Sequence, residues 1–376
     1  MSCNASIVSR KARLQALLMK RGTHGHNREK NEDRLSDLPD GVLHHILSFS
    51  DAKQAVQSCI LSKRWKNLWK TLPTLKLTSR QFTTRRAFTK FVSHILSHRD
   101  ASTSLYTFDF HRAGFIAPQL LKRILKYAFS HNVQQLQINT SCRDLIFLPS
   151  FVSCHTLTSL NLCFNLYGVR TVFPNSLNLP ALTNLCLQYF IFYVNDDGHV
   201  DPFSTLNRLN SLNIYHCMVR GNQTLCISNA TLADLKINDD SYDGRMKFFE
   251  LSTPSLCTFV YCGTPYQKLC GNLSNLSSVK HVEIIVAYCC NYKPKNTSLV
   301  LLNWLIELPN AESLTISLTT LKVLSLVPDL LKVEFPSLYC LKSLKVVKDP
   351  SSASIPEEIV NFLIQNAPSA KVDTLP

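Results

Sequence analysis

The amino-acid sequence predicts an α/β fold: a small three-helix module followed by an irregular, horseshoe-shaped solenoid with parallel strands on its concave side. Two patterns lead to this prediction. A dense helical pattern fills residues 33–77, and a phrase of apolar residues then recurs in tandem along the chain. Apolar residues make up 45% of the 376 residues, enough for a sizeable core. We therefore expect a basic tail over 1–32, the helical module over 33–77, the solenoid over 78–348 and a capping segment over 349–376.

The positive charge is concentrated near the N-terminal end of the chain. Residues 1–100 hold 19 Lys/Arg against 7 Asp/Glu, whereas residues 101–376 hold 21 against 19. The larger part therefore lacks the basic face that a binder of duplex nucleic acid requires, and we expect no nucleic-acid partner. Residues 1–34 are expected to form a disordered, solvated tail, with nuclear import or binding to an acidic surface as the alternative.

The 14 cysteines are scattered, without a CxxC pair or the spacing of a metal site. Some adjoin strand-like leucines, as Cys163 and Cys186 do, where a thiol serves as a small apolar side chain. The sequence contains neither of the common Gly-rich phosphate loops, no recognisable secretory signal and no apolar run long enough to span a membrane. We expect a protein of the reducing cytoplasm or nucleus, with no cofactor, no metal and no membrane partner.

Three short helices are expected in the module. The first begins at Pro39, which suits the first helical position, the second is capped by Asp51, and the third is capped by Ser62 and runs over Lys63–Leu72. About 40 residues bury too little surface to be stable alone, so the module is expected to lean on its neighbour or on a partner. The apolar positions are Val42, Leu43, Ile46 and Leu47 in the first helix, Ala52, Ala55, Val56, Cys59 and Ile60 in the second, and Trp65, Leu68 and Trp69 in the third.

The residues of this module resemble an F-box, in the form found in large plant families. The resemblance rests on the run Leu35–Phe49, on Cys59–Trp65 with its Leu-Ser-Lys-Arg-Trp ending, and on Leu68-Trp69. It implies a three-helix fold that docks onto a Skp-family adaptor, which in turn holds a cullin and a RING protein. Carried over by position, the adaptor-binding residues are Leu38, Pro39, Leu43, Ile46, Leu47, Leu61 and Trp65.

One position departs from the family pattern. The family usually has a large apolar residue directly after the Ser48-Phe49 pair, and this sequence has Ser50. Losing such a side chain weakens docking or helix packing by about 2–3 kcal/mol. The departure bears on the affinity for the adaptor rather than on the identity of the module.

The second pattern is the phrase L-x-x-L-x-L with aliphatic or aromatic variants, which occurs eleven times at intervals of 23 to 33 residues. Most of these intervals lie in or near the range of leucine-rich repeats. The last two apolar residues of each phrase alternate with polar ones, so each phrase predicts a short strand with its apolar side chains turned inward. Together with the F-box, the repeats resemble plant F-box/leucine-rich-repeat (F-box/LRR) proteins. The phrases begin at Leu72, Leu105, Val133, Leu157, Leu182, Leu209, Leu232, Leu256, Val279, Ala311 and Leu341.

Helices are expected where the intervals are long. Apolar residues at helical spacing predict them on the convex side over 119–129 and 298–308, and a third over 82–97 that couples the F-box to the repeats. A closing helix is expected over 356–365, because solenoids need a cap at each end. Asn165 and Cys217 match the Asn/Cys position of the leucine-rich repeat, but most repeats do not keep it, so an irregular curve is expected.

The polar residues of the strands form a neutral surface suited to hydrogen bonding, and we expect a target protein to bind there. A small-molecule co-ligand in the concavity is the alternative. No supported nucleophile is found, because His281, Glu283 and the Cys289-Cys290 pair are already explained by a strand and its loop. The expected target-binding residues are Asn161, Asn184, Gln188, Asn213, Tyr215 and Lys236.

The resemblance thus implies a non-catalytic, substrate-recognising subunit of an SCF-type (Skp-cullin-F-box) ubiquitin ligase. Two rival interpretations stay open. One is a leucine-rich-repeat scaffold with a degenerate F-box and no link to ubiquitination, which Ser50 permits. The other is a nucleic-acid or membrane binder that uses the basic N-terminal residues.

Overall fold

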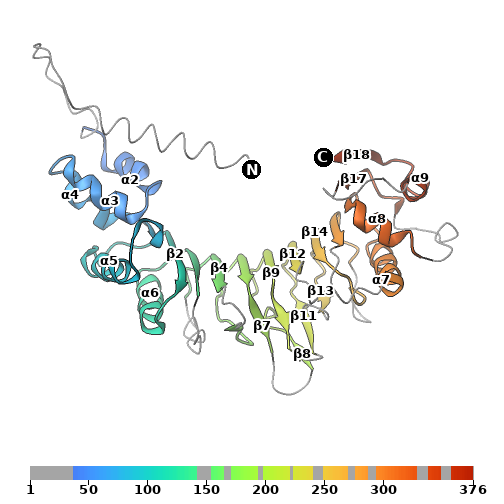
Figure 1. Ribbon diagram of the computed structural model, residues 1–376, viewed down its shortest axis with the longest axis horizontal. Helices are drawn as coiled ribbons and strands as arrows, with labels where there is room; N and C mark the ends of the chain where they lie inside the picture. Colours follow the sequence, from blue (N-terminus) through green and yellow to red (C-terminus); the bar gives the residue numbers. More distant parts are fainter. Residues whose placement is uncertain are drawn as a thin grey trace, which may run out of the picture. The chain divides into compact units, whose positions relative to one another are not determined.

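A computed structural model gives the fold of the chain (Figure 1). The chain divides into a unit that ends at Pro39 and a unit over Asp40–Pro376. The basic tail, Asn165 and the Cys289-Cys290 pair lie outside the described residues. The structure describes residues 37–141, 154–164, 171–193, 198–220, 223–239, 249–269, 276–286, 294–327, 338–348 and 357–375.

The second unit begins with a cluster of short helices. Asp51 caps the second of these as expected: its Oδ1 accepts from the Gln54 backbone N–H at 3.0 Å, and the Gln54 side chain accepts from the Asp51 N–H at 3.3 Å. The α-helices are α2 (Asp40–Ser48), α3 (Ala52–Gln57) and α4 (Trp65–Leu68), and the 3₁₀ turns are η1 (Ser58–Ile60) and η2 (Trp69–Thr71).

Two expectations for these helices were wrong. The second helix was expected to carry Ile60 on its apolar face, but α3 ends at Gln57 and the tighter winding of η1 turns Ile60 out to solvent. The third helix was expected from Lys63 with Ser62 as its cap, whereas α4 starts at Trp65 and no side chain caps it. The helical stretch made of α4 and η2 stops before Pro73, as expected. Leu72 is extended, as a residue before proline usually is.

The repeats form one parallel sheet of twelve strands in sequence order (Figure 1). Each of the eleven phrases supplies one strand, so the predicted strand positions are confirmed. The middle apolar residues of neighbouring phrases face each other, as Leu185 faces Leu160 on one side and Leu212 on the other, and the register shifts once, late in the pairing of β2 with β3. The strands are β1 (Thr74–Thr78), β2 (Thr107–Phe115), β3 (Gln135–Ser141), β4 (Ser159–Phe164), β6 (Asn184–Gln188), β9 (Ser211–Tyr215), β12 (Asp234–Asp239), β14 (Thr258–Gly263), β15 (His281–Val286), β16 (Ser313–Ser317), β17 (Ser343–Val347) and β18 (Lys371–Leu375).

Helices cover the apolar face of this sheet near its two ends. Figure 1 shows α5 and α6 against the first strands and α7 and α8 against the last ones. Phe88 of α5 packs on Phe110 of β2 with ring centroids 5.8 Å apart, which fixes the helix to the inward side of the strand. The expected helices are all present, and α8 is additional, capped by Ser317. Their bounds are α5 (Arg85–His98), α6 (Pro118–Ser130), α7 (Pro294–Glu307), α8 (Leu318–Leu324) and α9 (Glu357–Gln365).

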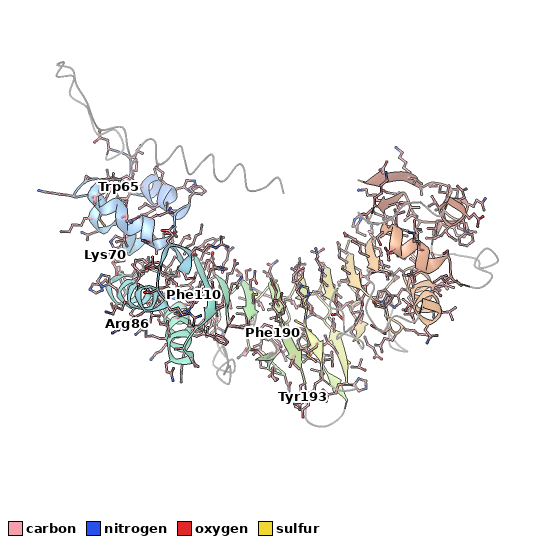
Figure 2. All side chains as sticks on the ribbon, in the orientation of Figure 1. Trp65, Lys70, Arg86, Phe110, Phe190 and Tyr193 are labelled. Atoms are coloured by element: carbon pink, nitrogen blue, oxygen red, sulfur yellow. The ribbon has the colours of Figure 1, made fainter. Side chains whose placement is uncertain are left out.

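In the middle repeats, two small parallel sheets take the place of helices. Short runs such as Phe190–Phe192 favour strands, because aromatic and β-branched side chains fit a pleated surface. Phenylalanines cluster in these repeats: the ring centroid of Phe173 lies 5.5 Å from that of Phe190, which is labelled in Figure 2, and 5.7 Å from that of Phe192. The small sheets consist of β5 (Thr171–Val172), β7 (Phe190–Phe192) and β10 (Met218–Val219), and of β8 (His199–Val200), β11 (Thr224–Ser228) and β13 (Phe249–Ser252).

The last described segments, 357–365 and 371–375, form a helix and an additional strand of the main sheet. The expected closing helix is present as α9, but the segment after it forms β18, which pairs with β17 in parallel. Residues 371–375 therefore supply a twelfth strand that the repeat pattern did not predict.

A buried arginine joins the helical cluster to the repeats. Arg99, just after α5, donates from Nη1 to the Trp69 carbonyl at 3.1 Å and from Nη2 to the Leu72 carbonyl at 2.5 Å. Its Nε donates to the Tyr127 hydroxyl of α6 at 3.2 Å. Two further bonds cross the same junction, since Lys76 donates to the Ser48 carbonyl at 2.9 Å and Lys53 to the Gln81 carbonyl at 2.9 Å. The helices and the first strand are thus held as one packed body.

Candidate functional site

Four large apolar side chains of the helical cluster face solvent. Their exposed fractions are 42% for Val42, 74% for Phe49, 88% for Ile60 and 41% for Leu61. Side chains of this size are mostly buried in folded proteins, and several exposed within 20 residues mark a surface that a partner covers. We call these four side chains the apolar patch.

The predicted adaptor-binding residues do not coincide with this patch. Leu61 belongs to it, and Ile46 is half-buried. Three others, Leu43, Leu47 and Trp65, are buried within the helical cluster, where they support the patch rather than form it. The remaining two, Leu38 and Pro39, lie in the unit that ends at Pro39. Sequence reasoning missed Phe49 and Ile60, and their exposure depends on the turns that end α2 and α3.

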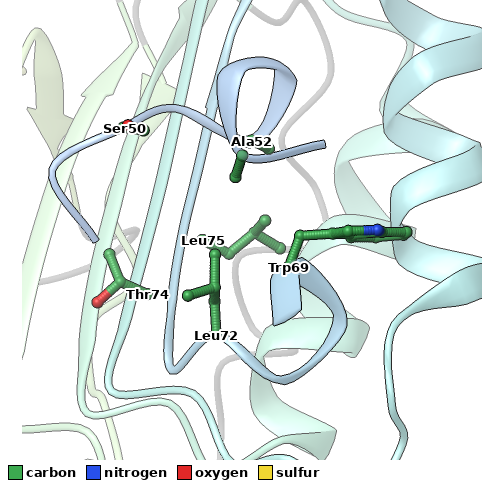
Figure 3. Close-up of a pocket in the computed structure, with 7 residues that line it drawn as sticks. Ser50, Ala52, Trp69, Leu72, Thr74 and Leu75 are labelled. Carbon is green, nitrogen blue, oxygen red and sulfur yellow. The ribbon is translucent and has the colours of Figure 1, made fainter. Parts of the chain in front are cut away.

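Ser50 lines a small hollow between the helices and the sheet (Figure 3). The hollow has room for about one water molecule, about 10 Å³. Its walls are mostly apolar, so a larger side chain at this position has apolar neighbours to contact. The lining residues are Ser50, Ala52, Ala55, Trp69, Leu72, Thr74 and Leu75.

The second candidate surface is the polar face of the main sheet. The strand register brings the six predicted target-binding residues together on four neighbouring strands. Asn161, Asn213 and Lys236 share one row with Cys186 across β4, β6, β9 and β12. Gln188 and Tyr215 face each other in the next row, and Asn184 lies in the row on the other side. All six are exposed or half-buried, so the alternation predicted from sequence is confirmed.

Burial shapes the electrostatics of this face. Burial raises the pKa of the Cys186 thiol, against a smaller opposing effect from its bond with Gln188, so this cysteine stays neutral. Nearer the helices, burial raises the pKa of the Asp109 carboxyl, while burial and then Arg80 lower the pKa of His111. Lys236 lies with its Nζ 6.0 Å from the centre of the Tyr215 ring, the outer limit of a cation–π contact.

Two residues at the ends of strands of this sheet were missed by sequence reasoning. Tyr189 and His216 directly follow β6 and β9 and have left-handed backbones, with φ of 65° and 50°. Their rings stack with centroids 5.1 Å apart and planes inclined by 18°. Asn238 faces outward on β12, and its Oδ1 is buried and accepts no hydrogen bond from the described residues. The one signal of this pair in the sequence is that Tyr189 and His216 each come directly after a predicted strand.

Metal sites and membrane spans are the other kinds of site to consider. Among the residues that the structure describes, no group of three or more His, Cys, Asp or Glu side chains is placed to hold a metal ion. None of the described helices is both long enough and apolar enough to cross a membrane. His281 and Glu283 point to the polar face of β15, as the strand pattern predicted.

Comparison with known proteins identifies the helical cluster and the repeats. The F-box domain model matches residues 35–80. A putative F-box/LRR-repeat protein of Arabidopsis thaliana is 27% identical over 94% of this chain and 74% of its own length. The chain thus carries an F-box and is similar over most of its length to F-box/LRR-repeat proteins of this plant. Another F-box/LRR-repeat protein of that plant is 28% identical over 60% of this chain and 74% of its own length. An F-box/FBD/LRR-repeat protein is 24% identical over 78% and 67%.

The F-box match and the similarity to F-box/LRR-repeat proteins indicate the kind of partner for each surface. The F-box implies an Skp-type adaptor as a partner of the helical cluster, and the leucine-rich repeats imply a protein substrate. The apolar patch lies inside the matched residues 35–80, and the six predicted target-binding residues lie outside them.

Proposed function

We propose that this F-box/LRR protein is the substrate-recognition subunit of an SCF-type ubiquitin ligase. The F-box docks a Skp-family adaptor, which links it to a cullin and a RING protein, and the repeats hold a target protein. The repeats curve as a horseshoe with the polar face on the concave side, and the complex works in the cytoplasm or the nucleus. The observation that carries the proposal is the apolar patch, four large side chains left uncovered within a matched F-box.

The proposed mechanism is proximity. Holding the target on the repeats raises the local concentration of its lysines beside a ubiquitin-loaded enzyme, and the chain itself forms no covalent bond to ubiquitin. Proximity requires a fixed geometry between the two surfaces. The bonds of Arg99, Lys76 and Lys53 across the junction support such a geometry, because they tie the F-box helices to the first repeats.

The test is adaptor binding by the full chain with charges placed in the patch. Ile60→Glu combined with Leu61→Glu is expected to weaken binding to a purified Skp-family adaptor by about tenfold or more. Leu299→Glu is the matched control, since Leu299 is an exposed leucine (47%) on α7, outside the F-box, and it is expected to leave the affinity unchanged. Trp65→Ala is a poorer test, because Trp65 is buried and its loss disturbs the fold as well as the docking.

The same experiment separates the proposal from its rival. A scaffold with a degenerate F-box would not bind the adaptor at all, in the wild type or in any variant. Adaptor binding that the double variant leaves intact would show that the patch is not the docking surface. A ubiquitin conjugate on the chain that reducing agents remove would contradict the non-catalytic role.

A further inference from the structure

The middle of the polar face is uncharged and rich in side-chain amides. The strands β3, β4, β6 and β9 carry no Asp, Glu, Lys or Arg at their outward positions, and charge returns on β12 with Asp234 and Lys236. Eight outward side chains between β3 and β12 are amides. They are Gln135, Gln137, Asn139, Asn161, Asn184, Gln188, Asn213 and Asn238. We call the outward side chains of β3, β4, β6, β9 and β12 the amide face.

An amide side chain both donates and accepts hydrogen bonds, as a peptide bond does. A surface of such groups therefore matches the main chain of an extended polypeptide, whose N–H and C=O groups need partners when water is displaced. A nucleic acid needs cations for its phosphates instead, and the amide face has none before Lys236. The five strands span about 19 Å, the length of about six residues of extended chain.

Tyr215 is the aromatic side chain of this face. Across the six strands from β3 to β14 it is the one outward-facing residue among Phe, Tyr and Trp. Tyrosine combines a large contact area with few rotatable bonds, and it is enriched among the residues that dominate binding energies. Next to it, Lys236 is exposed and forms no ion pair within the described part of the chain.

Two further observations support a ligand at this place. The Oδ1 of Asn238, directly opposite Tyr215 in the register, is buried and has no hydrogen-bond partner among the described residues, so an unmet acceptor lies beside Tyr215. The left-handed backbones of Tyr189 and His216 hold a stacked ring pair at the ends of the same strands. Such backbones are rare for large side chains and cluster at ligand-binding sites.

We propose that the amide face binds an extended polypeptide segment of the target, with its main chain read by the amides and an acidic side chain bound by Lys236 beside Tyr215. The inference rests on the proposed function, in which the repeats hold a protein target. It adds the class of target: a linear segment that carries an aspartate or glutamate within an otherwise uncharged stretch.

The test is a selection of linear peptides from a displayed random library on the purified full chain. Peptides enriched in Asp or Glu are expected, and synthetic versions of them should lose about tenfold in affinity for Lys236→Glu and for Tyr215→Ala. A repeat selection on Lys236→Glu should enrich Lys or Arg instead. The matched control is Lys345→Glu, which changes a lysine of the same row on β17, four strands away, and is expected to have no effect. Circular dichroism of each variant checks that the fold is kept.

The inference is overturned if the chain selects no linear peptide, or if the selected peptides bind Lys236→Glu and Tyr215→Ala as well as the wild type. Selection of peptides that depend on Lys345 rather than Lys236 would also overturn it. Adaptor binding is measured on the same samples. A chain that binds the adaptor but shows one of these results keeps the proposed function and loses the inference. A chain that selects acidic peptides through Lys236 but binds no adaptor loses the ubiquitin-ligase role alone.

Discussion

The junction made by Arg99 is open to a quantitative test. Arg99 is buried, and its guanidinium donates to two backbone carbonyls at the end of the F-box, those of Trp69 and Leu72. Burial lowers the pKa of Arg99 from its ordinary high value, against smaller contributions from Tyr127 and Asp100 that raise it. The side chain stays charged because arginine titrates far above neutral pH.

Replacing Arg99 by methionine keeps much of the length of the side chain and removes its donors. Each hydrogen bond from a charged group contributes about 1.5–3 kcal/mol, and the two carbonyls would be left buried without these donors. The methionine also removes the cost of burying a charge, which offsets part of the loss. We expect Arg99→Met to lower the free energy of unfolding by about 2–4 kcal/mol.

The assay is urea unfolding followed by tryptophan fluorescence, because Trp65 and Trp69, two of the three tryptophans, lie in the F-box. The matched control is Arg86→Met, which changes an exposed arginine of α5 (labelled in Figure 2) and is expected to shift stability by less than about 0.5 kcal/mol. If Arg99→Met unfolds at the same urea concentration as Arg86→Met, Arg99 does not join the F-box to the repeats.

Two further predictions concern stability. Ser50→Val adds about one apolar atom to the hollow of Figure 3, which has room for about one water molecule, and is expected to stabilise the chain by about 1 kcal/mol in urea unfolding. An unchanged midpoint would mean that the departure from the family pattern is harmless. Asp109→Asn is expected to raise the thermal midpoint at about pH 7 but not at about pH 3. Burial raises the pKa of Asp109 in the folded state, so the ionised carboxylate lowers the stability of the fold at neutral pH. This loss of stability disappears at low pH, where the carboxyl is protonated in both states. An equal rise of the thermal midpoint at both pH values would contradict this reasoning.

Much of the architecture followed from local patterns in the sequence. The period of two in each phrase predicted eleven strands and their inward side chains, because alternation along a strand is a local property. The cap at Asp51 and the end of the third helix before Pro73 were predicted for the same reason, since capping and proline geometry involve only near neighbours. The same alternation predicted that Asn213, Tyr215 and Lys236 face outward.

Other features depended on contacts between distant segments. Residues 371–375 form a strand because β17 offers an unpaired edge, which no repeat phrase reveals. Ile60 was expected to face inward and Trp65 to face the adaptor, but the 3₁₀ turn exposes Ile60 and packing buries Trp65. The unpartnered oxygen of Asn238 depends on the strands beside it. The sequence determined which residues form strands and which face each takes, whereas the tertiary structure decided which side chains are left for partners, because exposure depends on everything that packs around a residue.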